Sequence, residues 1–358
     1  MAMEMKMKMK MKMKEALPYI GMVSTQFAQV GLMIVGKKAM STGMTNFTFV
    51  FYSNALASLI LLPSFFFYRS IRSPLNFSLI CGFFLLGVLG CSAQLTGYAG
   101  INYTSASFAS AMLNLIPGFT FILAVIFRME KLDCRSTSTL IKSVGTVVSI
   151  AGAFTATLYK GPQILLTSSS LKPQNYLHFQ ETDWVIGGLY LVVDCIAVSA
   201  YLIVQASVLK SYPVELIVVF FYCFFSSILS AIVSLFMDMD LNAWMLQPGT
   251  RLFAVLYSGV FGSAFQVSVM FWCVRRRGPL FVAMFHPLGI VIAAALGIIF
   301  LGDIFYLGSL VGSIVIVVGF YAVMWGKTQE KKVDEDHLSR NINSKAPLLQ
   351  IKDAETEV

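Results

Sequence analysis

The chain has 358 residues, of which 57% are hydrophobic and only 12% are charged, about half the roughly 25% of an ordinary soluble domain. A soluble fold of this size could not bury so much apolar surface, so a soluble globular protein is excluded. A net charge of +8 would suggest nucleic-acid binding in a soluble protein. No base-stacking or groove-reading motif accompanies it, and retention of Lys and Arg in cytoplasmic loops explains it better.

Met and Lys alternate from Met5 to Lys14, a low-complexity pattern that predicts a disordered basic tail over residues 1–16. The apolar run that follows is too long for a cleaved signal peptide and lacks a cleavage site of the usual form. It is therefore predicted to remain as the first membrane span.

Charge-free apolar stretches predict ten spans, because one spanning helix needs about 20 residues. The stretch 73–127 is too long for one helix and is expected to break at a polar hairpin over Gly97–Ser107. The predicted spans are about 17–37, 47–68, 77–99, 105–127, 138–158, 184–206, 214–236, 251–274, 279–301 and 304–326.

An even number of spans places both termini on one side of the membrane. The loops on that side carry more Lys and Arg than the opposite loops, and the Lys-rich N-terminal tail adds to them. The positive-inside rule therefore predicts cytoplasmic termini. The triple arginine Arg275–Arg277 is interpreted as part of this orientation signal, with contact to anionic lipid as a lesser alternative.

The fifth and tenth spans resemble each other at one constant offset. Gly145 matches Gly312, Gly152 matches Gly319, and Lys160 matches Lys327. This predicts two five-helix repeats, 17–158 and 184–326, joined by an outer loop over 159–183 and followed by a disordered tail over 327–358. Because five is odd, the repeats must be inverted, as in many secondary transporters. Independent placement of glycines for helix packing remains the alternative.

Several motifs resemble a known family. They are QLTGYAGINYTSASFASAMLNLIPGFTFILA (Gln94–Ala124), LYKGP (Leu158–Pro162), QASVLKSYP (Gln205–Pro213) and RGPLFVAMFHPL (Arg277–Leu288). The chain resembles the plant walls-are-thin-1-related, nodulin-21-like proteins, in the EamA branch of the drug/metabolite transporters. The resemblance implies an all-α membrane protein of ten helices in two inverted EamA repeats. It also implies movement of amino acids, or of auxin-like and related organic acids, across the plasma membrane or the tonoplast.

Three ionisable residues fall within the spans, where their cost makes each a candidate for function. Asp194, near the middle of the sixth span, is interpreted as a proton-coupling carboxylate or the partner of a substrate ammonium, with a structural hydrogen-bonded carboxyl as the alternative. His286 is a candidate for substrate binding, or else a structural histidine beside a loosened backbone. Lys142 is a weaker candidate, because its side chain could extend to the cytoplasmic surface.

Polar and aromatic residues extend the candidate site. Pro287 and Pro117 each predict a kink in the fourth span of a repeat, and Asn114 lies beside the second of these. Glu130 and Asp303 end the two fourth spans and are predicted to act as gate or cap residues. The further candidates for substrate binding are Gln94, Gln26, Gln266, Tyr98 and Trp272. Gln29 is three residues from Gln26, so both could face the interior of the bundle.

These patterns predict a secondary or facilitative transporter of amino acids or related small organic acids that works by alternating access. An auxin or indole-compound carrier is the alternative within transport, and a non-transporting scaffold or sensor is the alternative of another class. An enzyme is not expected, because HExxH, GxSxG and nucleotide-loop motifs are missing from the sequence. The six cysteines lack metal or redox spacing, so neither metal nor cofactor is expected. The expected partners are a small-molecule substrate and the lipid bilayer, with no nucleic acid, and a homodimer is left open. The plasma membrane is expected first, with the vacuolar membrane as the alternative.

Overall fold

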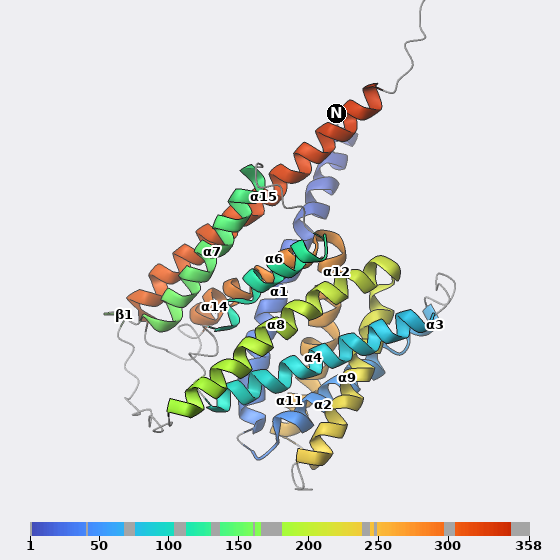
Figure 1. Cartoon of the computed structure of the whole chain (residues 1–358). Coiled ribbons are helices and arrows are strands. Elements are labelled where there is room, and N and C mark those ends of the chain that lie inside the picture. Colours follow the sequence, from blue (N-terminus) through green and yellow to red (C-terminus); the bar gives the residue numbers. More distant parts are fainter. Residues whose placement is uncertain are drawn as a thin grey trace, which may run out of the picture.

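The computed structural model describes residues 2–40, 42–67, 76–103, 112–129, 137–159, 162–165, 181–237, 244–246, 249–296 and 305–344 (Figure 1). Helices account for nearly all of this part of the chain. Helix satisfies every backbone polar group inside a bilayer, and the apolar sequences with little charge over most of their length suit the surrounding hydrocarbon. The protein is an all-α integral membrane protein.

The first half contains α1 (Ala2–Met40), α2 (Asn46–Leu61), the short α3 (Ser64–Phe67), α4 (Phe77–Tyr103), α6 (Ile116–Ile126) and α7 (Thr137–Leu158). The second half contains α8 (Glu181–Ser211), α9 (Glu215–Met237), α11 (Thr250–Tyr257) with η1 (Ser258–Gln266) and α12 (Val267–Arg277), then α13 (Pro279–Ala283), α14 (Phe285–Leu296) and α15 (Leu307–Ser344). Helix is therefore present in all ten predicted spans.

Five stretches of helix are long and apolar enough to cross a membrane, as judged by length and composition: Phe77–Gly97, Thr137–Thr155, Val185–Ser211, Glu215–Met237 and Thr250–Arg277. Shorter apolar helices lie at Asn46–Leu61, Ile116–Ile126, Pro279–Gly289 and Leu310–Gly326. The first long stretch does not end at the predicted hairpin, because α4 continues through Gly97 to Tyr103. Residues 104–111 lie outside the described part of the chain.

Helices at equivalent positions in the two halves pack against each other in antiparallel pairs. In the α2–α9 pair, Thr48 Oγ1 lies 3.0 Å from Ser234 Oγ, and Asn54 Nδ2 donates to Ser226 Oγ at 3.4 Å. The helices α2 and α9 therefore run antiparallel. The α7–α15 pair, side by side in Figure 1, behaves in the same way. Antiparallel packing of equivalent helices is what inverted repeats require.

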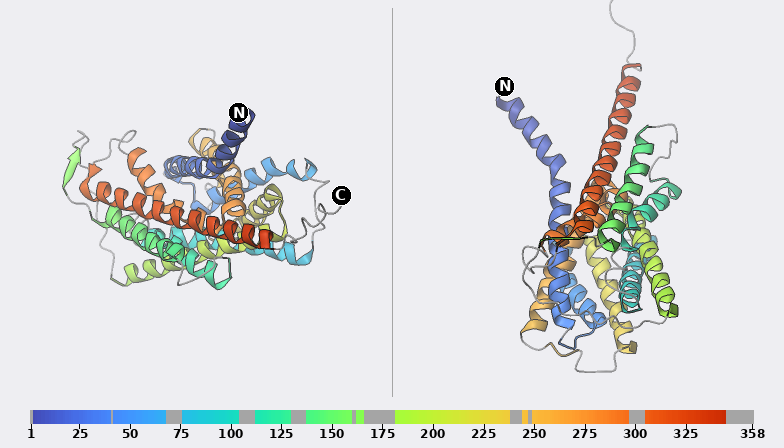
Figure 2. Two further views of the ribbon diagram at one scale, coloured as in Figure 1. Left: turned by 90° about the horizontal axis from the view of Figure 1, so that it is seen from above. Right: turned by 90° about the vertical axis from the view of Figure 1, so that its left-hand side faces the viewer.

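Both ends of the described chain project from one side of the bundle, here named the terminus side (Figure 2). Residues 345–358 lie outside the described part of the chain. The described residues of the two segments that were expected to be disordered tails, 2–16 and 327–344, are helical, since α1 begins at Ala2 and α15 continues to Ser344. The physical reason is cooperativity. A helix already nucleated within the bundle can continue through Met, Lys, Glu and Gln, which favour helix, without a new nucleation step.

Three helices are interrupted near the middle of the bundle. The chain turns at Asn114 and Leu115 before α6, and it turns at Met284 between α13 and α14. Each break precedes a proline, Pro117 and Pro287, because the ring removes a backbone donor and restricts the residue before it. The third interruption is η1, a π-helix of nine residues between α11 and α12; such segments often occur at functional sites.

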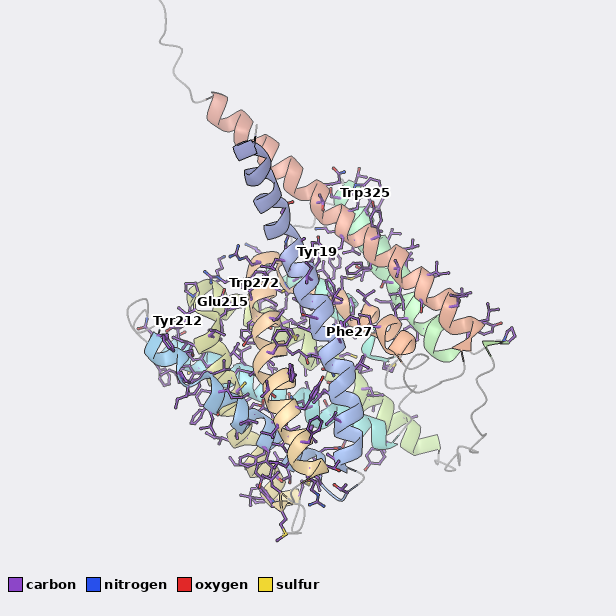
Figure 3. All side chains as sticks on the ribbon, turned by 180° about the vertical axis from the view of Figure 1, so that it is seen from behind. Tyr19, Phe27, Tyr212, Glu215, Trp272 and Trp325 are labelled. Atoms are coloured by element: carbon purple, nitrogen blue, oxygen red, sulfur yellow. The ribbon has the colours of Figure 1, made fainter. Side chains whose placement is uncertain are left out.

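Basic side chains connect the helix ends on the terminus side. Arg275 Nη1 lies 2.5 Å from Glu215 Oε1 and also donates to the carbonyl oxygen of Pro213. Arg277 Nη2 donates to the carbonyl oxygen of Glu15 at 3.1 Å. Figure 3 shows Glu215, Tyr19 and Trp272 gathered at this end of the molecule. The arginines interpreted as an orientation signal thus also connect α12 to α1 and α9.

A small two-stranded ribbon lies on the side of the bundle opposite the termini. β1 (Gln163–Leu165) pairs antiparallel with β2 (Phe305–Tyr306), with Gln163 opposite Tyr306 and Leu165 opposite Phe305. It ties the outer connecting loop to the chain just before α15. The rest of the described chain contains no other strand.

Candidate functional site

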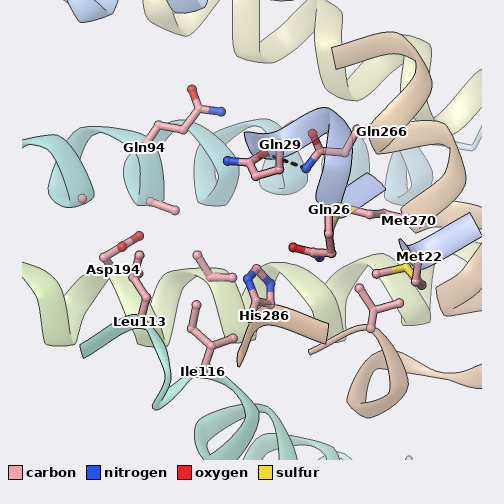
Figure 4. A pocket seen from close by; sticks show the side chains of 14 residues that line it. Met22, Gln26, Gln29, Gln94, Leu113, Ile116, Asp194, Gln266, Met270 and His286 are labelled. Atoms are coloured by element: carbon pink, nitrogen blue, oxygen red, sulfur yellow. Dashed lines mark hydrogen bonds between the residues drawn. The ribbon is translucent and has the colours of Figure 1, made fainter. Parts of the chain in front are cut away.

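A cavity of about 330 Å³ lies between the two halves of the bundle. Three helices of the first half (α1, α4 and α6) and five segments of the second half (α8, η1 with α12, and α13 with α14) surround it (Figure 4). Equivalent helices of the two repeats thus supply opposite walls. The lining residues are Met22, Gln26, Gln29, Ala93, Gln94, Gly97, Leu113, Ile116, Asp194, Val198, Gln266, Met270, Val282 and His286.

Asp194 supplies a carboxylate to this cavity from α8 (Figure 4). Its side chain is 5% exposed and faces Gly97 of α4, where an added Cβ would lie 3.1 Å from Asp194 Oδ2. A glycine at this point leaves room for the carboxylate between the two helices. Burial of a carboxylate without compensation is costly, and the geometry indicates that a cation or a proton is the expected companion.

His286 enters the cavity from the first turn of α14, just after the break at Met284. It lies apart from Asp194 within the cavity (Figure 4). The site therefore holds two ionisable groups, a carboxylate that attracts cations and an imidazole that attracts anions when it is protonated. The two groups could contact different ends of one solute.

Side-chain amides occupy much of the remaining wall. Gln266 Nε2 donates to Gln29 Oε1 at 2.8 Å, which joins the second half to the first. Gln94 Oε1 and Gln266 Oε1 are buried and have no hydrogen-bond partner among the described residues. Gly289 leaves room for the Gln26 amide, since a Cβ at this glycine would collide with Gln26 Oε1. Unpaired carbonyl oxygens in an apolar bundle are acceptors available to a ligand.

The structure brings together five of the predicted site residues in this cavity: Gln26, Gln94, Asp194, Gln266 and His286. Gln29, which was not among the predicted binding residues, joins them. Its spacing of three residues from Gln26 was the signal, because positions three apart share one helix face. Met22 and Met270 were also missed, since a methionine in an apolar helix carries no distinguishing pattern.

Trp272 does not line this cavity, so its predicted role in stacking a substrate stays a prediction without support from this lining. The guanidinium of Arg276 lies 5.7 Å from the Trp272 ring centroid, at the terminus-side end of α12. The rotation of about 100° per residue explains the difference. Met270 is nearly in phase with Gln266, whereas Trp272 is turned about 240° from it.

Two further candidates, Asn114 and Lys142, are buried but do not line the cavity. Asn114 is 2% exposed in the turn before α6, between the lining residues Leu113 and Ile116, but it is not itself part of the lining. Lys142 is fully buried in α7, where its stem packs against Gly326 of α15. The proposed extension of Lys142 to the surface is therefore wrong for this structure, because α15 covers it.

The remaining candidates are only partly described. Pro117 and Pro287 are buried next to the breaks in the fourth helices. The backbone of Tyr98 belongs to α4, but its side chain lies outside the described part of the structure, as do Glu130 and Asp303. Groups of His, Cys, Asp or Glu that could hold a metal ion are absent from the described residues.

Comparison with known proteins decides the family. The EamA-like transporter family matches residues 17–158 and 185–325. The chain belongs to this family. The two matched segments are the two EamA repeats, so the chain has the architecture of a membrane transporter family.

Plant relatives match nearly the whole chain. The WAT1-related protein At3g28050 of Arabidopsis thaliana is 44% identical, over 94% of this chain and 96% of that protein. Protein WALLS ARE THIN 1 of the same plant is 36% identical, over 88% of this chain and 84% of that protein. A crystal structure of a protein with 12% sequence identity aligns with a TM-score of 0.65, over 88% of this chain and 98% of that chain. That likeness is one of fold alone.

Proposed function

We propose that the protein is a secondary transporter that moves amino acids, or related small organic acids, by alternating access. The observation that carries this proposal is the cavity between the inverted repeats, which contains Asp194, His286 and a set of side-chain amides. Transporters of inverted-repeat design place their sites at this interface, near broken helices. The breaks before α6 and α14 border the cavity.

The chemistry of the lining favours a small zwitterion. A volume of about 330 Å³ is at the lower end of the range for ligand sites. Asp194 suits a substrate ammonium or a coupling proton, and His286 suits a carboxylate. The amides of Gln26, Gln94 and Gln266 offer donors and acceptors to both ends.

An indole-compound carrier is the second candidate, supported by the similarity to WALLS ARE THIN 1 and by the resemblance described above. An aromatic solute is expected to stack on an aromatic side chain. The cavity lining that the structure describes contains Met, Leu, Ile and Val in place of aromatic rings. This lining favours amino acids as the first class to test.

The decisive experiment is uptake and efflux of radiolabelled compounds by the full chain in oocytes, across a panel of amino acids and indole acids at several pH values. We expect flux of at least one amino acid. Asp194→Asn should reduce that flux by tenfold or more and remove its dependence on pH, because the carboxylate can no longer exchange a proton or hold an ammonium.

Cys195→Ala is the matched control on the same helix. The Cys195 thiol donates to the carbonyl oxygen of Met112 at 3.2 Å and does not line the cavity, so this variant should transport like the native chain. Unchanged, pH-dependent flux in Asp194→Asn would remove the coupling role. Flux of none of the panel by a correctly located native protein would favour a scaffold or sensor.

A further inference from the structure

Gln205 of α8 is a fully buried polar residue that the cavity does not explain. Its side chain is 0% exposed. Both atoms of the amide, Oε1 and Nε2, lack a hydrogen-bond partner among the described residues. A buried amide with neither group satisfied is among the least favourable arrangements in a protein interior, and it calls for a physical reason. Packing alone would favour Leu or Met at this position.

The position of Gln205 on its helix connects it to the cavity. Asp194, Val198, Tyr201 and Gln205 are separated by four, three and four residues, so they form one continuous face of α8. We name this face the α8 stripe. Asp194 and Val198 line the cavity, and Gln205 lies about 16 Å from Asp194 along the helix axis, toward the terminus side.

An aromatic cluster separates the cavity from Gln205. The ring centroids of Tyr201 and Tyr222 lie 5.3 Å apart, and the Phe271 ring lies 6.2 Å from Tyr201 and 6.1 Å from Tyr222. The exposed fractions of Tyr201, Tyr222 and Phe271 are 8%, 5% and 0%. These rings come from α8, α9 and α12, and Tyr201 stands between the lining residue Val198 and Gln205 along the α8 stripe.

We propose that Gln205 is a second substrate-binding residue, used when the bundle opens toward the terminus side. This inference rests on the proposed transport function. In that arrangement the three rings separate, the α8 stripe lines a continuous path, and the Gln205 amide receives the polar end of the solute after it leaves Asp194. Its Nε2 donates to a carboxylate and its Oε1 accepts from an ammonium. The amide has no partner in the closed arrangement because its partner is the solute in transit.

Transport kinetics provide the first test, in proteoliposomes that contain the full chain. Gln205→Leu keeps the size of the side chain and removes the amide. Net flux is expected to fall about tenfold, while the half-saturation constant on the side opposite the termini changes less than twofold, because the cavity residues are intact. Gln205→Asn retains an amide and should recover a substantial part of the flux. Equal flux in Gln205→Leu and the native chain would overturn the proposal.

Thiol accessibility provides the second test, and it does not depend on knowing the substrate. In Gln205→Cys, a membrane-impermeant methanethiosulfonate reagent added from the terminus side should react several-fold faster than with the native chain. Ile203→Cys is the matched control, because Ile203 is 2% exposed at the same depth but about 160° around the helix. It should react no faster than the native chain. A Gln205→Cys variant that does not react while its vesicles transport would overturn the proposal.

The two tests separate this inference from the transport proposal. If no compound is transported but the thiol introduced by Gln205→Cys still reacts selectively from the terminus side, the opening path is supported and the assigned substrate class is wrong. If transport is normal and that thiol is protected throughout, the transport proposal stands and the role of Gln205 is wrong. Size-exclusion profiles of each variant in detergent establish that it is folded.

Discussion

At the scale of single residues, the hydrogen bond between Gln266 and Gln29 joins the two repeats across the cavity. The bond fixes Gln266 Nε2 and Gln29 Oε1 in place. It leaves Gln266 Oε1 without a hydrogen-bond partner among the described residues. An amide that is positioned by one bond and open at another atom is prepared for a ligand. Interhelical hydrogen bonds in membranes contribute only about 0.6 kcal/mol on average, so this bond orients the site more than it stabilises the bundle.

A double-mutant cycle tests that reading. Gln29→Leu and Gln266→Leu should each raise the half-saturation constant for the transported solute. In the double variant, the increase in the half-saturation constant should be about threefold smaller than the product of the two single increases. This factor corresponds to roughly 0.6 kcal/mol. Concentration-dependent uptake by the four proteins measures the coupling. Effects that simply multiply would mean that the two amides act independently.

Single residues also show where sequence reasoning ended. The amides and the intramembrane carboxylate stood out because polar groups are rare in apolar helices, and Gln26, Gln94, Asp194, Gln266 and His286 do meet in one cavity. Trp272 could not be placed, because its direction depends on the phase of its helix relative to the neighbouring helices. Gln205 belonged to a recognisable motif, but only the packed structure shows that its amide is without a partner.

At the scale of helices, the α7–α15 pair depends on backbone contact. A Cβ on Gly319 would lie 2.5 Å from Ser149 N and 2.7 Å from the Gly145 carbonyl oxygen, and one on Gly152 would lie 2.8 Å from Ile316 N. Backbone atoms cannot move aside as the end of a flexible side chain can. The helix packing expected from the sequence as an alternative role for these glycines is therefore present, and small residues at such interfaces allow close packing in membranes.

Replacing Gly319 with Leu should therefore separate α7 from α15. We expect a destabilisation of at least about 1–3 kcal/mol, the usual cost of overpacking, and a clear fall in the melting temperature. Differential scanning fluorimetry in detergent measures it. Val318→Leu is the control, because Val318 is 58% exposed in the isolated bundle. Similar melting temperatures for both variants would contradict the close packing.

Helix boundaries illustrate a second limit of the sequence. Apolar length predicted the spans well, since it is a local property. The breaks in the two fourth spans were also predicted, from Pro117 and Pro287. The π segment η1 and the continuation of α1 and α15 beyond the membrane were less accessible. They depend on cooperativity along a helix and on which carbonyl and amide groups neighbouring helices can satisfy.

At the scale of the whole molecule, the described chain is a two-part bundle with both ends on one side (Figure 2). The aromatic cluster of Tyr201, Tyr222 and Phe271 lies toward that side from the cavity. The same side carries the Arg275–Glu215 ion pair, whose side chains are 40% and 21% exposed. Exposed ion pairs contribute at most about 1 kcal/mol, so this one can connect α12 to α9 without preventing their separation.

The distribution of Lys and Arg predicts that this side faces the cytoplasm. Tags fused to the two ends of the chain should both be digested by protease in inside-out vesicles and both be protected in sealed right-side-out vesicles. Immunoblotting of the two tags checks the outcome. Protection of one tag and digestion of the other would contradict an even number of spans, and digestion of both in right-side-out vesicles would reverse the orientation.

The π-helix η1 has a consequence for how this chain tolerates change. A π segment accommodates more residues per turn than an α-helix, so in effect it stores an inserted residue within a continuous rod. Deleting one residue between Ser258 and Gln266 would let the regular α pattern form while the flanking helices keep their relative orientation. Deleting one residue from the regular helix α11 would instead rotate everything downstream by about 100°. Gln266 and Met270 would then leave the cavity wall. Among sequences that keep the same site, one-residue gaps should therefore fall within η1 more often than in the regular helices α11 and α12 that flank it.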